Sequence, residues 1–232
     1  MSAHRIDSMA PAGLESAFFG MGCWLNSEPR FGVVRGVWKT TVGYCGGRSA
    51  NPSHEDMGDH IETVMVEYDP RTVTYGQLLD IFLNWIAGQE AQWRTRDEEL
   101  WSLRPPVLRQ HIPCVFARNT GEKRLAEAAI ERRNFPEELL NDTLDIRVSM
   151  RHAFHGAELW RQKYFLRASH WLMKEVRGSY PDEDALVRST LATRLNGIVG
   201  QVRPLASSCL PEELYLYDLS EAATAVLQRF LA

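Results

Sequence analysis

The segment from Ile61 to Tyr68 restricts the fold more than any other part of the sequence. Its side chains fall into two alternating sets, and Asp69-Pro70 follows as a stop signal; the sets are Ile61, Thr63, Met65 and Glu67 against Glu62, Val64, Val66 and Tyr68. A period of two predicts a β-strand with two distinct faces. One member of this strand, Glu62, is a carboxylate among apolar neighbours. Such a residue usually faces solvent, but beside an apolar pocket it can act as a proton donor.

Periodicity and turn residues predict the remaining elements. Thr74, with Gln77 three residues later, forms a capping box at the start of a helix. A long ordered loop is expected over 88–106, and Trp85, Trp160 and Trp171 are expected to pack in the core. Strands are expected at 17–22, 37–44, 112–117 and 144–149, and helices at 23–33, 119–133, 153–172, 182–196 and 219–231.

This order of strands and helices predicts an α+β fold, in which helices pack on a two-layer mixed sheet. We expect a flexible leader over residues 1–14 and a catalytic domain over 15–175. A helical C-terminal extension is expected to pack on that domain over 176–232.

Composition excludes several classes of function. The 232 residues are 44% hydrophobic and carry a formal net charge of −4, with no basic stripe that would indicate nucleic-acid binding. No run of about 18 apolar residues predicts a membrane span. The first residues lack a signal-peptide core, so a cytoplasmic protein is expected. The four cysteines (Cys23, Cys45, Cys114 and Cys209) form no CxxC pair, which argues against a metal cluster.

The chemistry is expected at Gly20-Met21-Gly22-Cys23-Trp24, between a predicted strand and a predicted helix. Unsatisfied N–H groups and the dipole at a helix N-terminus stabilise a thiolate. A neighbouring glycine lets a substrate approach the backbone closely. The alternative interpretation is that Cys23 is a small buried hydrophobic residue. The local pattern alone leaves both open.

A longer series of motifs resembles the A-type peptide methionine sulfoxide reductase family. The similarity covers roughly residues 16–168. Segments in this range resemble the family's GCFWG, GYxGG, NPxY, GHxE and YDP motifs. The segments that carry it, in order, are Gly22-Cys23-Trp24, Glu28, Phe31, Val42 to Gly47, Asn51-Pro52, His60-Ile61-Glu62, Tyr68-Asp69-Pro70 and, near the other end, Phe154 to Glu158 with Gln162-Lys163-Tyr164.

The resemblance implies a ferredoxin-like core and a mechanism. Cys23 would attack the sulfur of a methionine-S-sulfoxide, free or in a peptide, while Glu62 protonates the oxygen as general acid. The product would be a sulfenic acid on Cys23. A second thiol would resolve it to a disulfide, and thioredoxin or a small thiol would then reduce the enzyme. No bound cofactor and no metal are implied.

The sequence departs from the family where the substrate would bind. Leu25 stands in place of the GCFWG tryptophan, and His54 in place of the NPxY tyrosine. Leu108-Arg109 stands where the family has tyrosine-arginine. We therefore expect Trp24, Leu25, His54 and His60 to contact the substrate. His54 or His60 would replace a tyrosine donor, and Trp24, Trp93 or Trp101 would supply an aromatic surface.

Cys209 is the candidate resolving thiol, because it follows Pro204 in a loop-like stretch; an ordinary thiol is the alternative. Three functions stay open at this stage. One is sulfoxide reduction. Another is a related cysteine enzyme that acts on a different sulfur or acyl compound through a covalent Cys23 intermediate. The third is a non-catalytic redox or binding module.

Overall fold

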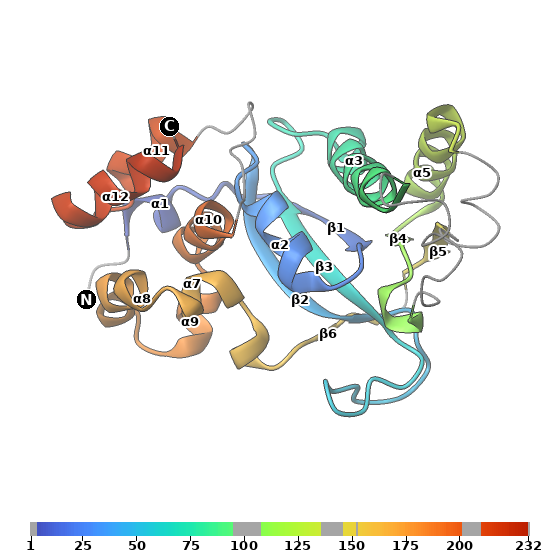
Figure 1. Ribbon diagram of the computed structural model, residues 1–232, viewed down its shortest axis with the longest axis horizontal. Helices are drawn as coiled ribbons and strands as arrows, with labels where there is room; N and C mark the ends of the chain where they lie inside the picture. The colour runs from blue at the N-terminus through green and yellow to red at the C-terminus, as the bar shows by residue number, and fades with distance from the viewer. Residues whose placement is uncertain (1–3, 95–107, 136–145, 152, 201–209, 232) are drawn as a thin grey trace.

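A single mixed sheet forms the centre of the molecule (Figure 1). The computed structural model describes residues 4–94, 108–135, 146–151, 153–200 and 210–231. The strands lie in the order β5-β4-β1-β3-β2-β6. Their bounds are β1 Glu15–Gly20, β2 Val37–Cys45, β3 Ile61–Tyr68, β4 Cys114–Ala117, β5 Arg147–Met150 and β6 His155–Gly156.

The first four strands and two helices form the predicted ferredoxin-like core. Helix α2 (Trp24–Gly32) follows β1, and helix α3 (Tyr75–Arg94) follows the β2–β3 pair. Strand β1 runs antiparallel to both β3 and β4, and β2 runs antiparallel to β3. A βαββαβ order with this arrangement is the ferredoxin-like motif. The α+β prediction is therefore confirmed.

The two faces of the sheet are covered unequally. Helices α2, α3 and α5 (Thr120–Arg133) cover one face, and the main hydrophobic core lies beneath them (Figure 1). The capping box at the start of α3 is present: Thr74 Oγ1 accepts from the Gln77 N–H at 3.2 Å, and Gln77 Oε1 accepts from the Thr74 N–H at 2.8 Å. The opposite face carries a smaller apolar cluster of Phe18, Cys45, Ile61, Cys114 and Phe116.

A second hydrophobic core lies among short helices at one end of the sheet (Figure 1). It includes Ile6, which precedes the sheet in the chain, and Val33, which follows α2. The elements at this end are α1 Arg5–Ser8, α7 Tyr164–Ala168, α8 His170–Val176, η3 Arg177–Ser179, α9 Glu183–Val187, α10 Thr190–Val199, α11 Leu210–Glu213, η4 Leu214–Leu216 and α12 Glu221–Leu231.

The beginning of the chain is fixed to this second core. The His4 ring nitrogen Nδ1 lies 2.6 Å from the Tyr217 carbonyl oxygen, and Arg5 forms an ion pair with Asp218 at 2.8 Å. Asp7 accepts hydrogen bonds from the Tyr180 hydroxyl and the Leu191 N–H. Contacts with the far end of the chain therefore hold residues 4–7.

Side chains close the part of the β2 edge that β6 leaves unpaired. Gln162 accepts from the Val42 N–H at 2.9 Å and donates to the Val42 carbonyl at 2.8 Å. Lys163 Nζ donates to the Thr40 carbonyl, and Thr193 Oγ1 accepts from the Thr40 N–H. An exposed strand edge is a template for pairing with other chains. These contacts satisfy that edge and attach the second core to the sheet.

Helix α10 crosses α2 at backbone contact. A Cβ on Gly197 would lie 2.9 Å from the Gly32 carbonyl carbon, and one on Gly32 would overlap the Thr193 carbonyl oxygen. Only glycine fits at both positions. The Arg194 guanidinium, which is buried, donates to the Gly32 carbonyl at 2.8 Å and pairs with Glu213 at 2.9 Å.

Three expected elements differ from the structure. The helix predicted over 182–196 is divided into α9 and α10. The helix predicted over 153–172 is broken into β6, the turn η2 (Leu159–Arg161), α7 and α8, because His155 and Gly156 pair with β2 instead. Trp160 and Trp171, expected in the core, are 58% and 37% exposed. The loop predicted over 88–106 is also wrong at its start, since α3 continues to Arg94. Its glutamine, glutamate and alanine residues are good helix formers.

Candidate active site

Cys23 is the N-cap residue of α2 and directly follows the loop that ends β1. Gly22 before it has φ +77°, a left-handed conformation that favours glycine. A Cβ at Gly22 would meet no heavy atom within 4 Å, so the space beside the thiol is open. Cys23 itself is only partly buried. The sequence prediction of a strand, a glycine turn and a helix beginning at Cys23 is confirmed.

Burial raises the pKa of the Cys23 thiol above its ordinary value, and the negative charge of Glu62 raises it further. The Leu25 and Asn26 N–H groups and the Arg161 charge oppose this rise without cancelling it. The helix N-terminus thus acts in the expected direction, but the sequence could not show that desolvation exceeds it. At neutral pH the resting group is therefore mainly the thiol.

Glu62 reaches the start of α2 from strand β3. It is 4% exposed, and its Oε2 accepts from the Trp24 N–H at 3.1 Å. Its Oε1 lies 3.2 Å from Nε2 of His111, in the turn η1 (Arg109–His111). The first N–H groups of α2 thus contact two functional groups. The Trp24 N–H donates to the Glu62 carboxylate, and the Leu25 and Asn26 N–H groups stabilise the Cys23 thiolate.

Trp24 and Tyr44 add aromatic rings to the site, and Tyr44 stands directly opposite Glu62 in the β2–β3 register. The Trp24 indole is buried and meets the Tyr44 ring edge-on, with centroids 5.2 Å apart. The Tyr44 hydroxyl donates to Glu158 at 3.0 Å, and burial, followed by this hydrogen bond, raises the Tyr44 pKa. Glu158 also accepts from the His54 N–H at 2.9 Å.

An exposed tryptophan and a partly buried arginine border the same site. The His54 ring lies edge-on to Trp160 with centroids 6.0 Å apart, and the Arg161 guanidinium stacks over Trp160 at 4.0 Å. His54 is therefore placed beside a tryptophan that the sequence had assigned to the core. Tyr44, Glu158 and Arg161 were not predicted as site residues, although Tyr44 and Glu158 stand within the motifs that carry the family resemblance.

Trp85 holds the loop in front of the thiol. Its Nε1 donates to the Met21 carbonyl at 3.0 Å, and the Arg30 guanidinium lies 3.6 Å from its ring centroid. Trp85 also packs against the main core, as predicted, but this hydrogen bond gives it a second role two residues before Cys23. A tryptophan at a core-like helical spacing gives no sign of such a contact.

His60 supports a turn. Its Nδ1 accepts from the Gly47 N–H at 3.2 Å, so its Nε2 carries the proton and donates to the Ser49 carbonyl at 2.9 Å. Both ring nitrogens are thus occupied by backbone. Between the two histidines proposed as replacement donors, only the exposed His54 keeps its ring nitrogens without a hydrogen bond in the described part of the chain.

Other predicted site residues are placed as follows. Leu25 is partly buried and packs against the main core. Cys209, Trp101 and the side chain of Trp93 lie outside the described residues. His111 was missed by sequence reasoning. Its signal was a lone histidine two residues after Arg109, where the family's tyrosine-arginine pair was sought.

Cys45 and Cys114 lie elsewhere, buried in the cluster on the opposite face of the sheet. Among the residues that the structure describes, no three His, Cys, Asp or Glu side chains gather as a metal site would require. No helix in the described ranges is long and apolar enough to cross a membrane.

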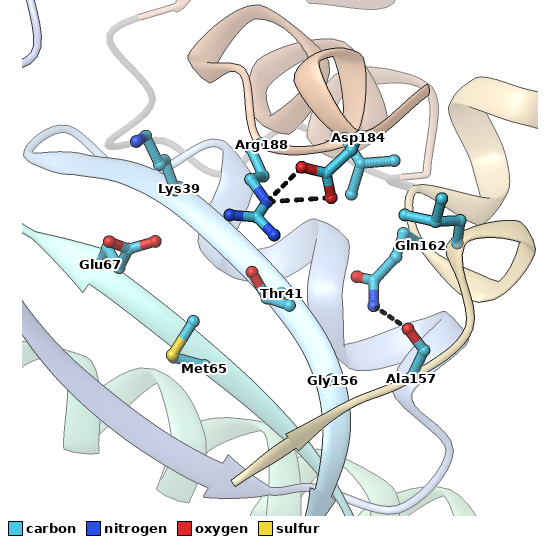
Figure 2. Close-up of a pocket in the computed structure, with 11 residues that line it drawn as sticks. Lys39, Thr41, Met65, Glu67, Gly156, Ala157, Gln162, Asp184 and Arg188 are labelled. Atoms are coloured by element: carbon cyan, nitrogen blue, oxygen red, sulfur yellow. Dashed lines mark hydrogen bonds and ion pairs between the residues drawn. The ribbon is translucent and has the colours of Figure 1, made fainter. Parts of the chain in front are cut away.

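A hollow of about 530 Å³ opens on the face of the sheet opposite the main core (Figure 2). Its charged groups include Arg188, which pairs with Asp184 at 3.0 Å, and it includes neither Cys23 nor Glu62. The catalytic candidates and the hollow therefore lie apart. The lining residues that Figure 2 labels are Lys39, Thr41, Met65, Glu67, Gly156, Ala157, Gln162, Asp184 and Arg188.

Comparison with known proteins gives the family of the chain. A family model described as peptide methionine sulfoxide reductase matches residues 15–192. The chain belongs to this family. Its members are oxidoreductases that reduce methionine sulfoxide with thiols. The predicted resemblance is thereby confirmed.

Relatives from plants and insects support the family assignment. Peptide methionine sulfoxide reductase A5 of Arabidopsis thaliana is 37% identical over 195 residues, which cover 82% of this chain and 70% of that protein. A peptide methionine sulfoxide reductase of Drosophila melanogaster is 32% identical over 81% of this chain and 69% of its own length.

Solved structures share the fold. Methionine sulfoxide reductase A of Corynebacterium diphtheriae aligns with a TM-score of 0.50 and 23% identity, over 69% of this chain and 77% of its own. Reduced Mxr1 of Saccharomyces cerevisiae aligns with a TM-score of 0.51 and 16% identity, over 69% and 88%.

Proposed function

We propose that the chain reduces methionine-S-sulfoxide, free or in peptides, with Cys23 as nucleophile and Glu62 as general acid. The Cys23 sulfur attacks the sulfoxide sulfur, and Glu62 supplies the proton to the departing oxygen. The products are methionine and a Cys23 sulfenic acid, so the oxygen moves from one sulfur to the other. A second thiol condenses with the sulfenic acid, which releases water and leaves a disulfide.

The sharing of the first N–H groups of α2 between Glu62 and Cys23 supports this proposal most directly. Adjacent N–H groups of one helix turn hold the carboxylate of Glu62 and stabilise the anionic form of Cys23. Trp24, Leu25 and Asn26 therefore bring the Glu62 carboxylate and the Cys23 sulfur to the same end of α2. Trp24 N–H and His111 use two of the lone pairs of Glu62, and a carboxylate has about four. Capacity thus remains for a sulfoxide oxygen.

The raised pKa of Cys23 fits a thiol that is activated only during reaction. The negative charge of Glu62 is one cause of the rise. When Glu62 carries a proton, that cause disappears and the thiolate becomes easier to form. The same protonated carboxyl group is the form that can donate to the sulfoxide oxygen. Protonation of Glu62 therefore prepares the acid and the nucleophile together.

The aromatic residues of the site are the buried Trp24 and Tyr44, with His54 and Trp160 nearer the surface. We propose that Trp24 and Leu25 contact the methyl group of the sulfoxide and that His54 contributes a hydrogen bond. These residues replace the tryptophan and tyrosine that the family motifs carry at positions 25 and 54. His60 contributes indirectly by holding the turn at Gly47.

The test is turnover of a methionine sulfoxide peptide with dithiothreitol. Wild-type protein is expected to convert the S-epimer, and Cys23→Ser is expected to abolish conversion. Cys114→Ala is the matched control, since Cys114 is buried on the other side of the sheet. Intact-protein mass spectrometry without reductant should show one added oxygen or a disulfide. A persistent heavier adduct would instead indicate the acyl-transfer alternative.

Cys209 is proposed as the resolving thiol, with thioredoxin or a small thiol as the final reductant. Cys45 and Cys114 are buried at the opposite face, which leaves Cys209 as the remaining candidate. Cys209→Ser should keep turnover with dithiothreitol and lose most turnover with thioredoxin. Equal rates with thioredoxin would remove Cys209 from the cycle. We also propose the cytoplasm as the compartment, because thiols are kept reduced there.

A further inference from the structure

Arg161 is a cation beside the reacting thiol that the mechanism above does not use. It lies in η2, and its Nε is buried without a hydrogen-bond partner. Its guanidinium stacks over the Trp160 ring at 4.0 Å and forms no ion pair within the described residues. A guanidinium has five N–H donors and no acceptor. Arg161 is therefore oriented by an aromatic ring but keeps its donors available.

The carboxylates near Arg161 are engaged by other groups. Burial pushes the pKa of Glu158 upward, but the His54 N–H, its own N–H and the Tyr44 hydroxyl together hold it below its usual value. Glu158 is thus an anion that already accepts hydrogen bonds from Tyr44 and His54. Glu62 accepts from Trp24 and His111. Neither carboxylate forms a salt bridge with Arg161.

The cations of the Figure 2 hollow show the usual arrangement. Arg188 there pairs with Asp184, and Lys39 stands directly opposite Glu67 in the β2–β3 register. Arg167, at the beginning of the second core, pairs with Glu183 at 2.7 Å. Arg161 differs from Arg188 and Arg167 because it forms no ion pair with a carboxylate of the described residues.

The position of Arg161 links it to the reaction. Its positive charge lowers the pKa of Cys23 and of Tyr44, which places it within electrostatic reach of both. The stacked Trp160 is 58% exposed and meets His54 edge-on. A substrate held at Cys23 and lying along Trp160 would therefore bring its neighbouring groups to the guanidinium.

We propose that Arg161, supported by Trp160, binds a carboxylate of the substrate next to the methionine sulfoxide. This inference rests on the proposed function and names the preferred substrate class: methionine sulfoxide adjacent to an acidic residue. A planar guanidinium suits this ligand because it can donate two parallel hydrogen bonds to a carboxylate. Arg161 also offsets the negative charges of Glu62 and Glu158, which would otherwise repel an acidic peptide.

The test compares two peptides that differ only in charge. Acetyl-Gly-Met(O)-Glu-amide carries a carboxylate after the sulfoxide, and acetyl-Gly-Met(O)-Gln-amide is its neutral match. A second pair places the glutamate or glutamine before the sulfoxide. For wild-type protein, kcat/KM should be about tenfold or more higher for one glutamate peptide than for its neutral match, as a charged hydrogen bond implies. The preference should shrink as salt is added.

Variants at position 161 should change this ratio. Arg161→Gln should bring the glutamate-to-glutamine ratio to about one, mainly through KM, and Arg161→Glu should invert it. Arg161→Lys should keep part of the preference, since the charge stays while the planar pair of donors is lost. Trp160→Ala should weaken it. Arg151→Gln is the matched control, because Arg151 also lies over an aromatic ring, that of Phe18, on the opposite sheet face.

Each outcome assigns a role. Turnover of the neutral peptides with no preference for either glutamate peptide would overturn the carboxylate subsite and leave the reductase function standing. An equal loss for charged and neutral peptides in Arg161→Gln, with an upward shift of the Cys23 pKa, would show that Arg161 acts only on the thiol. Absence of turnover for all four peptides would count against the proposed function itself.

Discussion

Glu28 and Glu62 are equally buried, at 2% and 4% exposure, yet their surroundings are opposite. Glu28, within α2, accepts from Lys163 Nζ at 2.5 Å, Thr40 Oγ1 at 2.9 Å and Asn196 Nδ2 at 3.2 Å. Glu62 accepts from a backbone N–H and lies beside the imidazole of His111. The structure therefore gives Glu28 three donors, one of them a buried ammonium, and gives Glu62 two partners, neither of them a lysine or arginine.

This difference separates a structural role from a chemical one. The Glu28 carboxylate is held by a buried ammonium, a hydroxyl and an amide, and it joins α2, β2 and α10. A carboxylate without a permanent cation beside it can gain and lose a proton during reaction. Glu28 lies within α2, and Glu62 accepts a hydrogen bond from the first residue of that helix. A single helix therefore takes part in both the junction of the two cores and the reactive site.

Glu62→Gln is expected to give the largest effect. Turnover of methionine sulfoxide should fall about 10²–10⁴-fold, because an amide cannot supply the proton. The free energy of unfolding should change little. Glu67→Gln is the control, since Glu67 lies on the same strand but lines the hollow of Figure 2. Equal rates for Glu62→Gln and wild-type protein would remove the distinction between the two carboxylates.

Lys163→Met should show the opposite pattern. Loss of the ammonium leaves the Glu28 charge buried, so the free energy of unfolding should fall by about 3–5 kcal/mol. Turnover per folded molecule should stay close to wild type. Urea unfolding measures the first quantity. The control, Arg188→Met, breaks an exposed pair with Asp184 and should cost no more than about 1 kcal/mol.

Gly197→Ala probes the same junction through packing. The new Cβ would lie within 3.0 Å of the Gly32 and Val33 backbone, so the helices must move apart. We expect a loss of about 1–3 kcal/mol in the free energy of unfolding. Gly88→Ala in α3, where a Cβ meets nothing within 4 Å, should instead be neutral or stabilising. Similar results for both variants would contradict the close crossing.

The smallest and most specific expected effect is a change in the pKa of Cys23. Because the Glu62 charge raises it, Glu62→Gln should lower it. Iodoacetamide should therefore modify Cys23 faster near neutral pH in this variant, although sulfoxide turnover falls. The rate measured against pH locates the midpoint, which in wild-type protein should lie above that of an ordinary thiol. An unchanged midpoint would show that Glu62 does not act on the thiol.

Local patterns predicted the part of the molecule built from neighbouring residues. The alternation from Ile61 to Tyr68 matches β3 at both ends, and Thr74 with Gln77 begins α3 as the capping box requires. The side chain of Asn119 caps helix α5 and accepts from the Glu122 N–H. The family motifs then indicated the roles of Cys23 and Glu62, whose positions around α2 agree with a joint function.

Local sequence patterns could not predict the contacts between distant segments. His111 reaches Glu62 across 49 residues, and Lys163 reaches Glu28 across 135. Neither pair shares a periodic pattern that a single sequence would reveal. The broken helix over 153–172 has the same cause, because pairing of His155 and Gly156 with β2 outweighs the local helical preference.

The sequence by itself determined the elements of the core, the placement of Cys23 at a helix start and the family. Only the tertiary structure decided which buried carboxylate is paired with a lysine, that burial raises the pKa of the thiol, and that the exposed Trp160 and the partly buried Arg161 lie beside the site. The physical reason is that hydrogen bonds along a helix or strand depend on near neighbours. Burial and charge depend instead on every segment that folds against a residue, whatever its distance along the chain.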